Sequence, residues 1–367
     1  MGLVIKNVIT VDPKAEKTEK KDLFINGSFI CEEKDLEGSP VVIEAENLHA
    51  CPALIDMHVH VFDGGLTPLG ISADKVGVTQ GVLTVADAGS TGIYNYPAFR
   101  EQVIDKSETR VKFFLNIAKK GLCEGLTELA DLTDLTSLEE LLNFKKAHGE
   151  HMVGIKVRMS SSVLGGNGLK PLLHAREVSN GTGLPLMVHI GNAPPSLGEV
   201  LSVLKKGDIV THCFHGKSGG LTDFKEEFQA AAERGVYFDV GHGMSSFSFK
   251  RVPEILEICD IDYAISTDIY TANFEAPVGS LMDTMSKFLP LGLSISEVVR
   301  KATALPAAMM NLAEDSLEVG SRANISLFTT GPAKTLIDSE GLEIRPDEPL
   351  KPFGLIKEGK VVWKSEL

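Results

Sequence analysis

The sequence predicts an α/β protein, a (β/α)8 (TIM) barrel that carries a small β-sandwich formed from both ends of the chain. In the middle of the sequence, eight short apolar runs alternate with stretches of helical periodicity, a pattern typical of a parallel sheet covered by helices. Both ends instead contain only short strand-like segments separated by turns, and neither end could bury a core alone. We therefore expect residues 1–50 and 318–367 to form one discontinuous β-sandwich and residues 51–317 to form the barrel.

The terminal segments are predicted as strands because short apolar stretches alternate with turn residues. Asn26-Gly27 between two apolar pairs is a hairpin signal, and Glu358-Gly359 separates two strand segments near the other end. The expected strands cover residues 3–5, 8–11, 23–25, 29–31 and 41–43 in the N-terminal part, and 324–329, 355–356 and 360–363 in the C-terminal part.

The central part is predicted to supply eight parallel strands with helices between them. Eight such units indicate a closed barrel, in which catalytic groups lie at the C-terminal ends of the strands. The expected strands cover residues 54–60, 82–86, 111–117, 153–157, 186–189, 208–213, 236–240 and 263–266, and the clearest helices cover 126–147, 172–180, 197–205 and 223–234.

Composition narrows the class of function. The 367 residues carry a formal net charge of −14, which argues against binding of a nucleic-acid backbone but not against a small anionic substrate. The five cysteines never form a CxxC pair, so we expect reduced thiols in the cytoplasm. No signal peptide is evident and no apolar stretch approaches the roughly 20 residues of a membrane span. We expect a cytoplasmic protein with a small-molecule substrate, without nucleic-acid or membrane partners, and with a possible homo-oligomeric state.

Polar side chains with metal-binding capacity follow five of the eight predicted strands. His58 and His60 are two positions apart on the first strand, so both imidazoles can face the barrel interior and hold one ion. Their alternative role is that of two polar residues on a surface strand. His189 and His212 end the fifth and sixth strands and form a plausible pair for a second ion, and imidazole nitrogen suits zinc. Each of the two could instead be a satisfied core histidine.

Lys156 lies within the apolar fourth strand, where a bare ammonium is costly to bury. Burial and a neighbouring cation both lower the pKa of a lysine. A neutral amine can add CO2 and become a carbamate, whose two oxygens could bridge two metal ions. The alternative is a lysine whose ammonium extends to the mouth of the barrel.

Asp268 follows the eighth strand and could bind the first metal ion and accept a proton from the attacking water. Its alternative role is that of a helix N-cap. Arg158 shares the facing direction of Lys156 and could hold a substrate carboxylate through two hydrogen bonds, or it could be a supporting residue. His242, at the end of the seventh strand, could polarise the substrate or orient a ligand, and Asp87 is expected to support backbone turns.

The strings IDMHVH, GIKVR, VHIGN, THCFHG and STDIY together resemble the binuclear subtype of the amidohydrolase superfamily, and most closely a bacterial branch of dihydroorotase-like or deacetylase-like enzymes. The resemblance covers essentially the whole chain. It implies that His58, His60 and Asp268 bind the more buried of two divalent ions, expected to be Zn²⁺, and that His189 and His212 bind the other. It also implies that Lys156, carboxylated by CO2 to N6-carboxylysine, bridges the two ions together with a hydroxide.

By this resemblance the protein is expected to be a metal-dependent amidohydrolase or deacetylase acting on carbon–nitrogen bonds other than peptide bonds. The bridging hydroxide would hydrolyse an amide or ester bond of a small N-acyl or O-acetyl compound that bears a carboxylate. One alternative is a dihydroorotase-like hydrolase of a cyclic amide, and an alternative of another class is an inactive scaffold of the same fold. Ala53 departs from the glycine that many relatives have at that turn, which concerns loop geometry more than chemistry.

Overall fold

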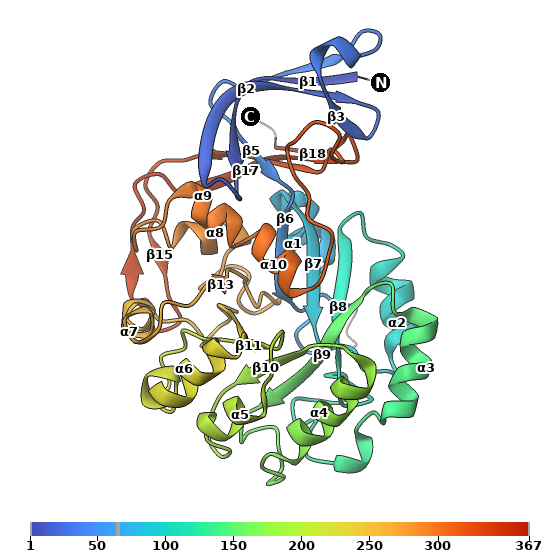
Figure 1. Ribbon diagram of the computed structural model, residues 1–367, viewed down its shortest axis with the longest axis vertical. Helices are drawn as coiled ribbons and strands as arrows, with labels where there is room; N and C mark the ends of the chain where they lie inside the picture. The colour runs from blue at the N-terminus through green and yellow to red at the C-terminus, as the bar shows by residue number, and fades with distance from the viewer. Residues whose placement is uncertain (1, 64–66, 366–367) are drawn as a thin grey trace.

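The computed structural model describes residues 2–63 and 67–365, so the outermost residues of the predicted terminal domain (1 and 366–367) lie outside the described part. The strands form two eight-stranded sheets and one small two-stranded sheet. Figure 1 shows one large sheet, built from both ends of the chain, above the part that contains most of the helices. The molecule therefore has a mixed α/β fold with a parallel sheet and a separate sheet.

The parallel sheet contains eight strands in the order of the sequence, each parallel to the next, as predicted. Beyond the eighth strand the chain returns to the first: Asp268 N donates to His58 O (2.7 Å) and His60 N donates to Ile269 O (3.0 Å). The strands are β6 (Leu54–Val59), β7 (Val82–Ala88), β8 (Arg110–Asn116), β9 (Met152–Met159), β10 (Leu186–Ile190), β11 (Ile209–Thr211), β12 (Tyr237–Asp239) and β13 (Tyr263–Ala264).

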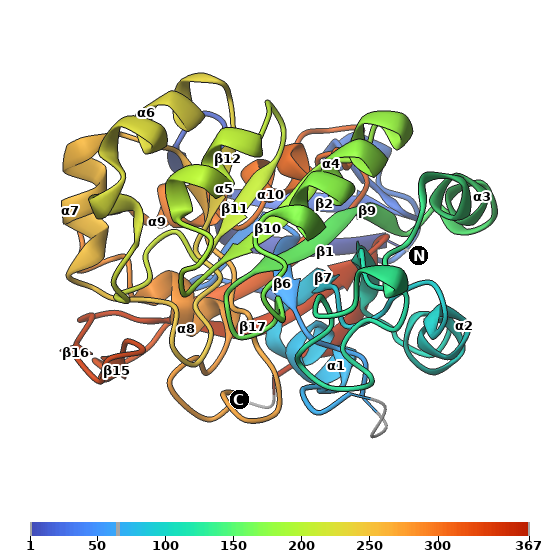
Figure 2. The same cartoon turned by 90° about the horizontal axis from the view of Figure 1, so that it is seen from below.

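Helices cover the outer face of this sheet, as Figure 2 shows for α3 to α7. Side chains alternate along each strand. Ile155 and Val157 of β9 therefore join the outer apolar cluster that includes Leu172 of α4, while Lys156 between them points to the opposite face. The helices are α1 (Ala73–Val76), α2 (Tyr96–Phe99), α3 (Leu138–His148), α4 (Lys170–Thr182), α5 (Leu197–Val203), α6 (Lys225–Glu233), α7 (Arg251–Ile258), α8 (Leu281–Ser286), α9 (Ile295–Arg300) and α10 (Ala304–Met309).

The helix predicted over residues 126–147 begins only at Leu138, so this prediction is wrong in its first half. The Ser137 hydroxyl accepts a hydrogen bond from Glu140 N, and the Glu140 carboxylate accepts one from Ser137 N. This capping box fixes the start of α3 because it satisfies backbone donors that have no partner within the helix. Residues 126–137 instead form turns and a short 3-10 segment (Leu132–Asp134), which places Glu128 in a loop after β8.

The second sheet joins the two ends of the chain through the antiparallel pairing of β5 with β14. Its own apolar cluster includes Ile5 and Ile25 from one end and Ile325 and Ile356 from the other. The strands are β1 (Gly2–Asp12), β2 (Lys17–Asn26), β3 (Phe29–Cys31), β4 (Val41–Glu44), β5 (His49–Pro52), β14 (Ile325–Thr330), β17 (Leu350–Lys357) and β18 (Lys360–Lys364).

The terminal segments differ from the prediction in several places. No strand was predicted at β5, and β2 begins at Lys17 instead of residue 23. Residues 3–5 and 8–11 belong to one continuous strand, because the backbone between them makes a bulge with Asn7 at φ 57° instead of a turn. In the sequence between β14 and β17, a separate small hairpin, β15 (Leu336–Ile337) and β16 (Glu343–Ile344), was not predicted. The turn at Asn26-Gly27 between β2 and β3 is confirmed.

Among the described helices, none has the length and apolar character needed to cross a membrane.

Candidate metal centre

The six side chains predicted to hold metal ions lie on five strands of the parallel sheet or in the segments that follow them, and they are close together. His58 Nε2 is 3.3 Å and His60 Nε2 is 3.2 Å from the same oxygen, Oδ1, of Asp268. Lys156 Nζ is 3.2 Å from His58 Nε2. The rings of His58 and His212 lie 5.1 Å apart, and those of His212 and His189 lie 4.4 Å apart. The residues therefore form one continuous cluster, which we call the His/Asp cluster.

The rings of His58 and His212 are each held at Nδ1 by a second residue. His212 Nδ1 lies 2.6 Å from Gly241 O, and since a carbonyl only accepts, this nitrogen carries the proton. His58 Nδ1 lies 2.8 Å from Thr211 Oγ1, whose hydroxyl donates to Asp239 Oδ2 (2.7 Å). Each Nε2 atom thus carries a lone pair: that of His58 faces Lys156 Nζ, and that of His212 has no partner among the described residues.

The donor atoms of the cluster fit a divalent metal ion. His58, His212 and Asp268 offer ligand atoms that all lie within 4.8 Å of one another. His212 Nε2 is buried and has no hydrogen-bond partner among the residues that the structure describes. A cation would satisfy this lone pair, and nitrogen and carboxylate ligands with the second ring nitrogen held by an outer partner are characteristic of zinc sites.

Burial and neighbouring charges set the protonation of the cluster. Burial lowers the pKa values of His58, His189 and His212 well below their ordinary range, so their rings are neutral. Burial also lowers the pKa of Lys156 to about 8, although the Asp268 carboxylate opposes this shift. For Asp268 burial acts in the other direction, but His58 and His60 outweigh it and hold the pKa of the carboxyl below its usual range.

The two predicted substrate-side residues are both engaged within the protein. Arg158 Nη1 donates to both carboxylate oxygens of Glu128 (3.1 Å each), a side chain that is only 2% exposed. His242 is fully buried, with Nδ1 2.9 Å from Gly243 O and Nε2 2.8 Å from Lys287 Nζ. Their roles toward a substrate therefore stay predictions.

Asp87 has the supporting role expected for it. Its two carboxylate oxygens accept hydrogen bonds from Val61 N (2.9 Å) and Ser90 N (2.7 Å). Ser90 Oγ in turn lies 2.9 Å from His60 Nδ1. Asp87 thus connects the loop after β7 to the residues that follow His60.

Sequence reasoning did not single out the outer partners Thr211, Asp239 and Ser90, nor Glu128 and Lys217. Thr211 and Asp239 could have been suspected, because each ends a strand next to a predicted site residue or a glycine turn. Glu128 lay within a segment predicted as helix.

Lys217 carries a positive charge near the cluster, five residues after His212. Its ammonium is half-buried; burial lowers its pKa and the Asp268 carboxylate raises it. In the described part of the chain it has no hydrogen-bond or ion-pair partner.

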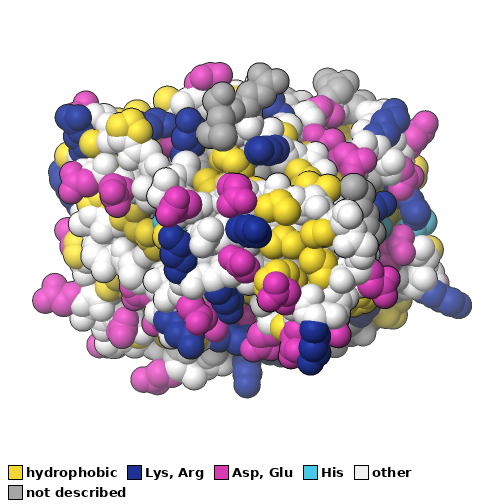
Figure 3. All heavy atoms as spheres, turned by 90° about the horizontal axis from the view of Figure 1, so that it is seen from above, with side chains coloured by type: hydrophobic (Ala, Val, Ile, Leu, Met, Phe, Trp, Pro, Cys, Tyr) yellow, Lys and Arg dark blue, Asp and Glu magenta, His cyan; other side chains and the backbone are white. Residues whose placement is uncertain are grey.

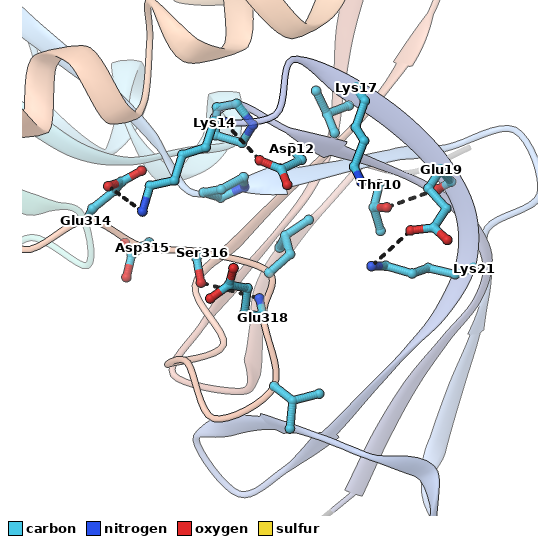
Figure 4. Close-up of a pocket in the computed structure, with 15 residues that line it drawn as sticks. Thr10, Asp12, Lys14, Lys17, Glu19, Lys21, Glu314, Asp315, Ser316 and Glu318 are labelled. Carbon is cyan, nitrogen blue, oxygen red and sulfur yellow. Dashed lines mark hydrogen bonds and ion pairs between the residues drawn. The ribbon is translucent and has the colours of Figure 1, made fainter.

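A separate pocket of about 280 Å³ lies away from the cluster, between residues 10–21 of the terminal sheet and residues 314–319. Figure 4 shows that Lys14 points to Glu314 across this pocket, and their ion pair measures 3.1 Å. None of the residues that line it belongs to the His/Asp cluster. We therefore place the candidate site at the cluster and not in this pocket.

Comparison with known proteins agrees with the geometry. Residues 50–362 match the profile of the amidohydrolase family. A protein named deacetylase from Brucella anthropi is 38% identical over 293 residues, 78% of this chain and 72% of the relative. Another deacetylase, from Enterococcus faecalis, is 38% identical over 84% of this chain and 85% of its own length.

Solved structures resemble the chain over nearly its full length. A structure described as a dihydroorotase has a TM-score of 0.89 and 33% identity, covering 99% of this chain and 98% of its own. One described as an adenine deaminase has a TM-score of 0.89 and 34% identity, covering 99% of both chains. A dihydroorotase from Streptococcus thermophilus is 28% identical, but over only 39% of this chain.

Proposed function

Because this chain belongs to the amidohydrolase family, we propose that it is a metal-dependent hydrolase of small N-acyl or O-acetyl compounds that bear a carboxylate. The observation that carries the proposal is the meeting of His58 Nε2 and His60 Nε2 at one oxygen of Asp268, beside the unpartnered Nε2 of His212. The deacetylases that resemble the chain over most of its length support an acyl substrate.

We propose that the chain holds two divalent ions, expected to be Zn²⁺. His58, His60 and Asp268 would hold one, His189 and His212 the other, and Lys156, carboxylated by CO2, would lie between them. The lowered pKa of Lys156 supports this modification, because only the neutral amine adds CO2. When bound, such ions lower the pKa of water and polarise the carbonyl group of a substrate.

The residues of the chain perform the remaining steps. Hydrolysis breaks the bond between the acyl carbon and its nitrogen or oxygen, adds the oxygen of water to the carbon and a proton to the leaving atom. Asp268, which its neighbours keep ionised, takes the proton from water and delivers it to the leaving atom. Thr211 and Ser90 hold the imidazoles of His58 and His60 in place.

Recognition of the substrate carboxylate is assigned to the cations beside the cluster. The Glu128 carboxylate neutralises much of the charge of Arg158. We therefore propose that the unpaired Lys217 supplies most of the attraction for the substrate carboxylate and that Arg158 orients this carboxylate through hydrogen bonds. We propose that His242 polarises the substrate or orients a metal ligand.

An activity screen with a matched pair of variants tests the proposal. The zinc-loaded protein is offered N-acetyl amino acids, O-acetyl hydroxy acids and cyclic ureides side by side. Asp268→Asn is expected to retain much of its metal and to lose most turnover, whereas Asp260→Asn, at an exposed position, keeps both. Full activity of Asp268→Asn would remove this carboxylate from proton transfer.

The second candidate is hydrolysis of a cyclic amide, which the similarity to a solved dihydroorotase favours. Preferential cleavage of cyclic ureides over acyl amino acids in the same screen would select it. A protein that binds no metal and cleaves none of these compounds would instead be the inactive scaffold.

The finer description of the fold is also a proposal. We infer that the parallel sheet closes into a (β/α)8 barrel over residues 51–317, supported by the bridge between Val59 and Ile269. Residues 1–50 and 318–367 would form the β-sandwich, supported by their shared apolar cluster.

We further propose a cytoplasmic protein that can form homo-oligomers and binds no nucleic acid. The formal net charge of −14 supports the last point, and on the face that Figure 3 shows, acidic side chains lie between the basic ones.

A further inference from the structure

The tip of the β15–β16 hairpin forms hydrogen bonds with the loop that follows β12. The residues of this tip that take part are Asp338, Ser339 and Glu340. Asp338 Oδ2 accepts a hydrogen bond from Phe249 N (2.9 Å). Ser339 N donates to Phe247 O (3.0 Å), and Ser339 Oγ lies 3.2 Å from Phe247 N. These contacts connect a segment between two strands of the terminal sheet to a loop of the parallel sheet, which we call the 241–249 loop.

The hydroxyl of Ser339 also reaches the beginning of the same loop. It lies 3.3 Å from the carbonyl oxygens of both His242 and Gly243, so it can donate to either of them. Glu340 Oε2 accepts from Ser248 Oγ (2.6 Å) and adds a third attachment. Ser339 is therefore the one tip residue that contacts the two ends of the loop at once.

The 241–249 loop begins directly against the His/Asp cluster. Gly243 has φ +56°, and a Cβ atom there would lie 2.5 Å from Asp268 Oδ2. Gly241 has φ +48°, and its Cβ would lie 2.3 Å from Thr211 Oγ1 and 3.1 Å from His58 Nδ1. Only glycine permits this conformation and this close approach, so the backbone itself forms the wall beside the Asp268 carboxylate.

Hydrogen bonds of the Asp338 carboxylate fix the conformation of the tip. The Asp338 side chain is 1% exposed, and its second oxygen, Oδ1, accepts hydrogen bonds from Glu340 N (2.8 Å) and Leu342 N (2.9 Å). One carboxylate thus fixes both the shape of the tip and its attachment to Phe249. Displacement of the loop would require three or more of these hydrogen bonds to break together.

We propose that Ser339 is a positioning residue, which fixes the carbonyl groups of His242 and Gly243 and thereby holds the backbone wall against the Asp268 carboxylate. The kinetic consequence rests on the proposed function, in which Asp268 transfers the proton. The structural consequence, order of the 241–249 loop, does not depend on it. The terminal sheet thus contributes to the candidate site through the segment that joins β14 to β17.

The test compares Ser339→Ala with Ser339→Thr, which keeps the hydroxyl, and with Glu343→Gln, an exposed residue on the same hairpin. For Ser339→Ala we expect kcat to fall about 10- to 100-fold because a small displacement of a reacting group is costly. KM should change less than about twofold, since Lys217 and Arg158, which are proposed to attract the substrate carboxylate, lie outside this loop. Ser339→Thr should recover most of kcat, and Glu343→Gln should match the wild type.

Hydrogen exchange of the metal-loaded proteins, followed by mass spectrometry, gives a readout that needs no substrate. Amide exchange in residues 241–249 should accelerate in Ser339→Ala and in neither of the other two variants. Unchanged exchange and unchanged kcat in Ser339→Ala would overturn the proposal, as would equal effects in Glu343→Gln. A wild type that hydrolyses no acyl compound would count against the proposed function, while the exchange result would still decide the role of Ser339.

Discussion

The hydroxyl of Thr211 links His58 to the buried carboxylate of Asp239, so its loss should weaken binding at the proposed metal site. Thr211→Val has nearly the same shape but removes the hydrogen bond that holds His58 Nδ1 (2.8 Å). Because outer partners of this kind orient the ligand, we expect zinc affinity to fall roughly 10- to 100-fold. Competition with a fluorescent chelator measures this affinity. Thr211→Ser keeps the hydroxyl and is the control, and equal affinities in Thr211→Val and the wild type would contradict the expectation.

Lys217 should determine preference for anionic substrates. Its half-buried ammonium has no partner in the described residues, so Lys217→Gln removes attraction for a carboxylate without leaving a buried charge unpaired. We expect KM for a carboxylate-bearing acyl substrate to rise about tenfold or more, the effect of losing about 1.4 kcal/mol. The value of kcat should change little.

Two comparisons make the Lys217 measurement specific. A neutral ester of the same substrate should show no change in KM, and Lys225→Gln, at an exposed position on α6, should behave as the wild type. If Lys217→Gln raised KM for the neutral ester by the same factor, Lys217 would affect the shape of the site and not its attraction for a carboxylate.

At the scale of the element, Lys287 follows α8 and is buried against the 241–249 loop. Its Nζ lies 2.8 Å from His242 Nε2 and donates to Pro277 O (2.7 Å). Burial lowers the pKa of Lys287 to about 7, opposed by Asp283 and Asp338 and reinforced by Lys334. Between this value and the ordinary 10.5, the unfolded chain binds more protons than the folded chain.

This difference predicts how stability depends on pH. Where the unfolded state binds more protons, the free energy of unfolding rises with pH, so Lys287 contributes a rise between about pH 7 and 10. Lys287→Met lacks that contribution. Its free energy of unfolding relative to the wild type should therefore decline steadily across the same range, as measured by urea unfolding at several pH values. Curves for the two proteins that stay parallel would show that Lys287 titrates normally, and Lys225→Met is the exposed control.

At the scale of the whole molecule, the proposed metal ions should stabilise the folded chain, because they would link side chains carried by five strands of the parallel sheet or by the segments that follow them. A ligand that binds only the folded state at 100 times its Kd adds about 2.7 kcal/mol to the free energy of unfolding. Removal of metal with a strong chelator should therefore lower Tm and abolish turnover, and added zinc should restore both. His58→Asn should show a smaller difference in Tm between chelated and zinc-treated protein. An identical Tm with and without chelator in the wild type would contradict metal binding.

The sequence by itself determined the elements that depend on local patterns. All eight central strands were predicted, because an apolar run such as residues 186–189 identifies a buried strand without any knowledge of its neighbours. It also predicted that His58 and Lys156 lie on strands and that Asp268 follows one. Because parallel strands bring their C-terminal ends to one edge, these residues were expected to meet. The family followed from the same residues, and the profile match agrees. Where a local signal was ambiguous, as at residues 126–137, the capping box of Ser137 decided the outcome.

Only the tertiary structure decided how these residues are supported. The contact of Thr211 with His58 spans 153 positions, and that of Ser339 with His242 spans 97. Likewise, the pairing of Arg158 with Glu128 depends on a loop whose path no periodicity encodes. Periodicity reports the environment of a residue along its own strand or helix, whereas a hydrogen bond between distant segments depends on where the packed core brings each backbone. For that reason the candidate metal-binding residues could be named from the sequence, while the contacts of Ser339 and of the outer partners Thr211 and Ser90 could not.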